Sequence, residues 1–204
     1  METKETYHHG NLRQALLEEA RSLIRVGGLS QLSMRKLAEQ VGVSRTAAYH
    51  HFKDKRALLI AIAQDGFEQL KEQAEQIPDE LSATQKMVRR CKLYLDFAFD
   101  DPALYELMYG KVIWSEGASD THLEGTAAQM FKDYCDFYAK LEALNEVRLV
   151  KPPALIARIH WATLHGLARL YVDGVFRIKP DTNQLATDIV DMRMAGIGVD
   201  QQVE

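Results

Sequence analysis

The sequence predicts an all-α protein of about nine helices in two domains. Apolar residues recur every three or four positions along most of the chain, which is the spacing of one face of an α-helix. No stretch alternates apolar and polar residues as a strand does, and there is no internal repeat or low-complexity segment. The 204 residues, of which 47% are hydrophobic, are enough for one large domain or two small ones.

Charge is distributed unevenly along the chain. The net charge is −4, but residues 1–56 contain ten Lys and Arg against six Asp and Glu, while the rest contains fifteen against twenty-three. The N-terminal part, residues 1–56, is therefore a basic head, and residues 57–204 are an acidic body. This distribution favours an anionic partner at the head. We therefore expect an N-terminal domain over residues 1–56 and a second domain over residues 57–204, linked by a helix that starts at residue 55.

The composition also indicates where the protein resides and what it lacks. Cys91 and Cys135 lie within helical patterns without CxxC spacing, which is typical of buried thiols in a reducing compartment. No spacing of metal ligands is present, so we expect neither a metal nor a cofactor. The sequence has no signal-peptide pattern and no apolar run as long as a membrane span, so we expect a cytoplasmic protein.

The first helical patterns are short and close together. One runs from Leu12 to the pair Gly27-Gly28, where glycine ends it. Ser33 can cap the next, which is a short amphipathic helix. Its single apolar stripe consists of Met34, Leu37, Ala38 and Val41.

A tight turn at Gly42 leads into the third helix. Glycine in the left-handed conformation commonly ends a helix, and Ser44 can then accept backbone N–H bonds as the cap of the next one. Val43, Ala48 and Phe52 supply the apolar side that packs against the second helix. The outward side combines phosphate donors, ring edges and small groups suited to a major groove: Arg45, Thr46, Ala47, Tyr49, His50 and His51.

Six further helices make up the body. Asp54 can cap a long fourth helix, which Pro78 stops. A capping-box spacing at Ser82-Ala83-Thr84-Gln85 starts the fifth, and Asp101-Pro102 opens a short sixth that ends at Tyr109. The remaining three patterns cover about 121–144, 154–175 and 181–194.

The short helices and their flanks resemble the N-terminal DNA-binding domain of the tetracycline-repressor (TetR) family, from about Asn11 to Phe67. Two further segments, Trp161-Ala162-Thr163-Leu164-His165-Gly166 and Tyr7-His8-His9-Gly10-Asn11-Leu12, are similar to a subfamily with a Trp, His and Gly signature in its C-terminal domain. The resemblance implies three helices for DNA and about six for a ligand-binding and dimerising body. It is carried by Met34-Arg35-Lys36-Leu37-Ala38, Gly42-Val43-Ser44, Ala48-Tyr49-His50-His51-Phe52 and Lys53-Asp54-Lys55-Arg56-Ala57-Leu58-Leu59.

The resemblance implies that Arg35, the six outward residues of the third helix and Lys55 contact DNA. Lys55 and Tyr49 would bind phosphates, and Arg45 would reach a guanine edge. Ala47 or the Thr46 methyl would lie against a thymine methyl. His50 departs from the family pattern, which is often more aromatic there, so its role stays open. The alternative for the whole face is a solvated polar surface.

Aromatic residues of the body form a candidate lining for a flat or amphipathic small molecule, although ordinary core packing is the alternative. His165 follows Trp161 by one helical turn and is either a polar anchor in that pocket or a packing residue. No nucleophile elbow, phosphate-binding loop or pair of metal-binding histidines is present, so we expect no enzyme. The candidate lining is Tyr94, Tyr105, Tyr109, Trp114, Phe131, Tyr134, Trp161 and His165.

A stripe with small residues marks the eighth helix as a candidate dimer interface, where two pairs of helices would form a four-helix bundle across a two-fold axis. The alternative is burial of the stripe within one subunit. Its members are Leu155, Ile159, Ala162, Gly166 and Leu170.

These patterns and the resemblance predict a homodimeric transcriptional regulator, a repressor, that binds a palindromic operator in double-stranded DNA and responds to a small-molecule effector. Two alternatives stay open. One is a DNA-binding regulator whose body docks a protein partner. The other is a small-molecule-binding or enzymatic helical domain with a vestigial head.

Overall fold

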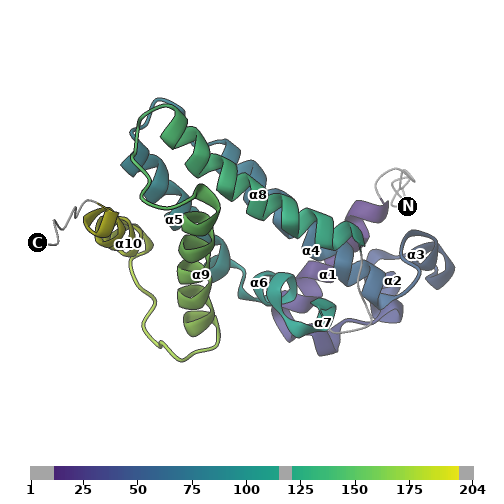
Figure 1. Ribbon diagram of the computed structural model, residues 1–204. Coiled ribbons are helices and arrows are strands. Elements are labelled where there is room, and N and C mark those ends of the chain that lie inside the picture. The colour runs from purple at the N-terminus through teal and green to yellow at the C-terminus, as the bar shows by residue number, and fades with distance from the viewer. Residues whose placement is uncertain (1–11, 115–120, 198–204) are drawn as a thin grey trace, which may run out of the picture. The chain divides into compact units, whose positions relative to one another are not determined.

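The computed structural model describes residues 12–114 and 121–197, and this part of the chain is helical without any strand (Figure 1). The predicted all-α fold with an N-terminal helix-turn-helix is confirmed. Two short elements of the described residues, the four-residue α7 and the 3-10 helix η1, were not expected. The elements are α1 (Leu12–Gly27), the 3-10 helix η1 (Leu29–Gln31), α2 (Met34–Val41), α3 (Arg45–His51), α4 (Lys55–Glu75), α5 (Ala83–Asp100), α6 (Pro102–Tyr109), α7 (Lys111–Trp114), α8 (Thr121–Ala143), α9 (Pro153–Val172) and α10 (Thr182–Ile197).

The described residues form two compact units that divide α4 after Gly66. The first contains α1 to α3, the start of α4, α6 and α7, and the second contains the end of α4, α5 and α8 to α10. These units are defined by the packing of the chain. The expected division by function at residues 56 and 57 stays a prediction. The expected family start at Tyr7–Asn11 lies outside the described residues.

The first unit is built by packing α1 against α2, α3 and η1. Leu16, Leu37 and Ala48 are fully buried where these helices meet. The Arg56 guanidinium at the start of α4 donates to the backbone carbonyls of Val112 and Ile113, at 3.2 and 3.0 Å. These two bonds hold α7 in the first unit, although its sequence is too short to form a stable helix alone.

The second unit is built on α5, which packs against α9 and α10, while α8 packs against α9. Three buried polar side chains connect these helices: His160 Nε2 lies 3.0 Å from Cys91 Sγ, and its Nδ1 is hydrogen-bonded to the Tyr138 hydroxyl. Both ring nitrogens therefore have partners, as buried polar groups need. His160 is a core residue that joins three helices.

None of the helices in the described ranges combines the length and the apolar character that crossing a membrane requires.

Candidate functional site

The connection between α2 and α3 has the geometry of a helix-turn-helix. Ser33 Oγ accepts the backbone N–H of Lys36 at 3.2 Å and so caps α2. Gly42 ends α2 with φ 76° and ψ 29°, the left-handed conformation that glycine adopts without steric cost. The Val43 backbone N–H then donates back to the Ala38 carbonyl at 2.9 Å. These local bonds fix the direction in which α3 leaves the turn.

α3 is fixed at both ends and on its inner face. Ser44 Oγ caps it by accepting the Ala47 backbone N–H at 3.1 Å. Ala48 is fully buried against α2, and Phe52 is buried at the C-cap with the Arg13 guanidinium 5.3 Å from its ring centroid. The sequence predicted these caps and buried positions correctly.

The outer face of α3 presents the residues that the sequence assigned to DNA. Arg45, Thr46, Tyr49, His50 and His51 are exposed, and Ala47 is half-buried; Arg35 on α2 is exposed as well. Such a face offers cationic, hydroxyl and ring donors for phosphates and base edges.

Lys55 makes a hydrogen bond within the first unit. Its half-buried side chain donates from Nζ to the backbone carbonyl of Leu29 at 2.8 Å, so it holds η1 against the start of α4. An ammonium group has three N–H donors, and this contact uses one of them. The phosphate contact expected of Lys55 stays a prediction, and the lysine also serves the fold.

The second unit contains a cavity of about 400 Å³ between α4, α5, α8 and α9. Its size is within the range of about 300–1,000 Å³ that is usual for small-molecule sites. The apolar part of its lining comes from all four helices and from the connection between α4 and α5: Leu70, Ala74, Ile77, Pro78, Leu93, Tyr94, Met130, Tyr134, Phe137, Leu141 and Trp161.

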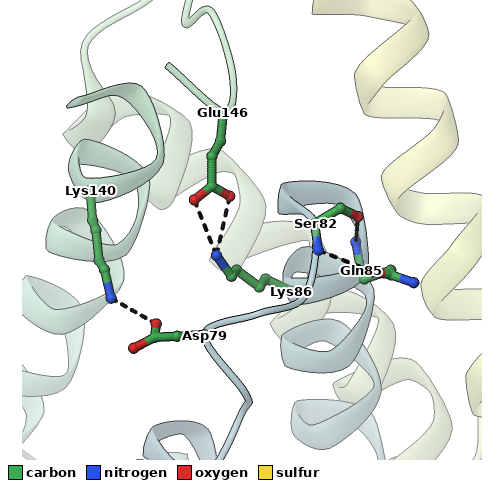
Figure 2. A network of polar contacts seen from close by, with 6 residues as sticks. All are labelled: Asp79, Ser82, Gln85, Lys86, Lys140 and Glu146. Carbon is green, nitrogen blue, oxygen red and sulfur yellow. Dashed lines mark hydrogen bonds and ion pairs between the residues drawn. The ribbon is translucent and has the colours of Figure 1, made fainter. Parts of the chain in front are cut away.

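Two ion pairs tie the connecting segments to helices beside this cavity (Figure 2). Lys86 on α5, which is buried and lines the cavity, donates to both carboxylate oxygens of Glu146 at 3.1 Å. Lys140 on α8 donates to Asp79 at 2.8 Å, and this bond holds the pKa of the Asp79 carboxyl below its ordinary value. The capping box of Ser82 with Gln85 starts α5 at the same place, as the sequence predicted.

Polar atoms without hydrogen-bond partners among the described residues lie in the cavity wall. They are Arg90 Nε, the Tyr134 hydroxyl and Asp133 Oδ2. The Arg90 guanidinium carbon lies 4.4 Å from the Phe137 ring centroid and 5.5 Å from that of Tyr134. Burial lowers the pKa of Arg90 and raises the pKa of Tyr134 well above its ordinary value. The phenol therefore keeps its proton at neutral pH and is available as a donor.

Family models match both units. The model for "Bacterial regulatory proteins, tetR family" covers residues 16–62, and the model for "Tetracyclin repressor-like, C-terminal domain" covers residues 87–192. The second match spans half of the chain. The chain belongs to the TetR family. Members of this family are transcriptional regulators and not enzymes, in agreement with the sequence-based expectation.

Individual curated relatives are similar over different lengths. The tetracycline repressor protein class C of Escherichia coli is 46% identical over 52 residues, which are 26% of this chain and 24% of that protein. The nucleoid occlusion factor SlmA of Vibrio vulnificus is 33% identical over 108 residues, or 52% of this chain and 55% of that protein. The matches thus span about half or less of these curated relatives.

A solved structure from Rhodococcus sp. RHA1, described as a protein with unknown function, is similar over nearly the whole chain. It is 29% identical with a TM-score of 0.83, and the match covers 96% of this chain and all 100% of that one.

Three of the aromatic residues expected at a pocket, Tyr94, Tyr134 and Trp161, line the cavity of this TetR-family body. Two others do not line the cavity but contact residues that do. The Phe131 ring centroid is 5.9 Å from that of Trp161, and His165 Nδ1 is 3.2 Å from the Tyr94 hydroxyl.

The remaining three expected pocket residues belong to the first unit and not to this cavity. Tyr105 is fully buried with its ring centroid 4.9 Å from that of Tyr109. The Trp114 indole N–H donates to the Met108 carbonyl at 2.6 Å. Helical spacing marks an inward face, but it does not say which unit that face belongs to.

The sequence-based prediction missed Arg90, although a signal was present. Arg90 follows Met87 by three positions and precedes Tyr94 by four, which places it on the buried stripe of α5. An arginine on an inward stripe has to find a partner or a polar cavity. Asp133 on α8, a second charged residue in the cavity wall, was missed as well.

The expected dimer stripe on α9 is largely uncovered in the single chain. Leu155 is 39%, Ile159 51% and Leu170 36% exposed. Ala162 is exposed as well, and a Cβ added to Gly166 would meet no atom within 4 Å. The alternative of burial within one subunit is therefore not supported, and the dimer itself stays a prediction.

We expect His165 to make stability depend on pH. Burial, with a smaller contribution from Arg169, lowers the pKa of its imidazole below 6.5. The unfolded chain therefore binds a proton at a higher pH than the folded chain, and the free energy of unfolding falls as the pH drops from about 6.5 toward the folded pKa. Urea unfolding of wild type at about pH 7.5 and about pH 5.5 should show this loss.

His165→Gln should reduce that loss, whereas His51→Gln, at an exposed position on α3, should leave it unchanged. An equal loss in wild type and His165→Gln would contradict the assignment.

Proposed function

We propose that this chain is a homodimeric, ligand-responsive transcriptional repressor that binds a palindromic operator. The observation that carries the proposal is the continuity of α4. It begins with Lys55 and Arg56, whose side chains donate hydrogen bonds to backbone carbonyls of Leu29 and Val112 within the first unit. Its last turns contribute Leu70 and Ala74 to the cavity wall. One helix therefore contains residues of both the DNA-reading unit and the cavity-bearing unit.

A small molecule in the cavity would act by differential affinity. If it binds better to one of two positions of the last turns of α4, it increases the population of molecules in which the whole helix occupies that position. The coupling is then reciprocal, because operator and ligand change each other's affinity by the same factor. A repressor of this kind releases its operator when the ligand concentration rises.

The exposed stripe on α9 supports the dimer. A self-complementary interface uses the same surface of both subunits, and small residues such as Ala162 and Gly166 let two helices approach closely. Two copies of α9 and α10 would form a four-helix bundle. A palindromic operator follows from the two-fold axis, with one copy of α3 for each half-site.

We also assign the chain to the subfamily with the Trp, His and Gly signature. Trp161 lines the cavity and the neighbouring His165 is bonded to Tyr94, which supports a shared role of this signature at the cavity.

A second candidate function is DNA binding by a protein whose body docks a partner protein, for which the exposed apolar residues of α9 would offer a surface. The cavity with buried polar atoms in its wall supports the ligand-responsive regulator instead, because a docking surface needs no such cavity. Release of operator DNA by a small molecule distinguishes the two.

Arg45→Ala and Lys55→Ala should weaken operator binding in different ways. Loss of a base contact by Arg45 should relax the preference at one position of each half-site, at about 1 to 3 kcal/mol. Loss of a phosphate contact by Lys55 should weaken binding to all sequences and reduce the salt slope by about one.

Gel shifts with selected and mutated duplexes over a range of salt concentrations measure both effects. Because Lys55 also holds Leu29, urea unfolding of each variant serves as the control for folding. Equal salt slopes and equal base preferences in the two variants would count against these roles.

Ile159→Asn should convert the dimer into a monomer, since it places an amide in the centre of the proposed interface. Val26→Asn is the matched control, because Val26 is an apolar residue of the first unit that is 87% exposed. Sedimentation equilibrium should give a monomer for Ile159→Asn and a dimer for Val26→Asn and wild type. A dimer of unchanged affinity in Ile159→Asn would place the interface elsewhere.

A further inference from the structure

We propose that the cavity binds an amphipathic monocarboxylate, whose carboxylate accepts hydrogen bonds from the Arg90 guanidinium and the Tyr134 hydroxyl. This inference rests on the proposed ligand response and names the chemical class of the ligand. Arg90 and Tyr134 are the two residues that select this class.

Arg90 provides the positive charge for this site. Its guanidinium lies against the rings of Phe137 and Tyr134, and its buried Nε has no hydrogen-bond partner among the described residues. A buried polar atom without a hydrogen bond costs free energy, and a buried cation costs more. A carboxylate would satisfy it, because the planar fork of N–H donors on arginine matches two carboxylate oxygens.

Tyr134 provides a second donor in the same wall. Its side chain is 9% exposed, and its hydroxyl has no hydrogen-bond partner in the described part of the chain. The Arg90 guanidinium lies over the ring of this tyrosine, so both donors border the same part of the cavity. Because burial raises the pKa of Tyr134, the hydroxyl is protonated and donates to an anion.

The other cations that line the cavity already have carboxylate partners. Lys86 is bonded to Glu146, Lys140 is bonded to Asp79, and Lys71 Nζ lies 4.0 Å from Glu75. Their charges are thus compensated within the protein. Arg90 packs against aromatic rings and has no ion pair at contact distance among the described residues, although the Asp133 carboxylate in the same wall acts on its charge from farther away.

Asp133 limits the charge of the ligand. Its Oδ1 accepts the Gln129 amide N–H at 2.7 Å, while its buried Oδ2 has no such partner among the described residues. This carboxylate lines the cavity together with Arg90 and would repel a second or third negative charge. A monocarboxylate therefore fits better than a phosphate or a nucleotide, and a hydroxyl or amide N–H on the ligand would satisfy Oδ2.

Most of the remaining lining is apolar and determines the body of the ligand. Leu70, Leu93, Met130 and Leu141 surround the cavity together with aromatic rings. Each CH₂ group that a ligand buries against such a surface contributes about 0.8 kcal/mol of hydrophobic free energy. A hydrocarbon or aryl body beside one carboxylate matches this distribution.

The test compares ligands that share one apolar part and differ only in the polar head group. Isothermal titration calorimetry of the full chain would use decanoate, decanol and decylamine, and also naphthoate, naphthylmethanol and naphthylmethylamine. We expect the carboxylate to bind at least about tenfold more tightly than the alcohol or the amine in one or both series, as one charge-assisted bidentate contact provides.

Arg90→Met should abolish the preference for the carboxylate and leave the affinity for the alcohol unchanged. The matched control is Arg89→Met, which removes the neighbouring, exposed arginine of α5 and should retain the wild-type preference. Tyr134→Phe should reduce carboxylate affinity alone. Thermal unfolding monitors whether each variant is folded, and a misfolded Arg90→Met would be replaced by Arg90→Gln.

The inference is overturned if the amine binds most tightly, if Arg90→Met weakens all three head groups equally, or if neither series binds. A gel shift with operator DNA separates this result from the proposed function. Carboxylates that bind through Arg90 but leave the operator affinity unchanged would support the ligand class and contradict the ligand-responsive repressor.

Discussion

α4 is a continuous helix of 21 residues, and its continuity is the constraint on which the functional account depends. Lys55 and Arg56 at its start bond to backbone carbonyls of η1 and α7, while Leu70 and Ala74 near its end line the cavity. An α-helix is held by a ladder of backbone hydrogen bonds and moves as one element. On this proposal, a ligand that favoured one position of the last turns would change the energy of the first turns.

The helix-turn-helix could be predicted from the sequence because its determinants are local. Ser33 and Ser44 cap helices within three residues, and Gly42 needs only its own backbone conformation to end α2. α7 escaped prediction for the opposite reason. Its four residues form a helix where Arg56, more than fifty positions earlier, donates hydrogen bonds to the backbone carbonyls of Val112 and Ile113. A contact between residues so far apart in sequence cannot be predicted from a local pattern.

The cavity was harder to predict because its wall is assembled from four helices distant in sequence. Aromatic content selected Tyr94, Tyr134 and Trp161, which line the cavity, but the same criterion also selected Tyr105, which packs in the other unit. Periodicity identifies an inward face and gives no information about what lies opposite. Arg90 shows the limit most clearly, since its stripe marks it as inward but only the assembled structure places it against Phe137.

The central claim is that the cavity and the DNA-reading face share one conformational equilibrium through α4. The most direct measurement is the affinity of a ligand, chosen by thermal shift from a metabolite panel, for the protein with and without an operator selected from random-sequence duplexes. The account predicts that the operator weakens ligand binding and that the ligand weakens operator binding by the same factor. Equal ligand affinities with and without the operator would contradict it.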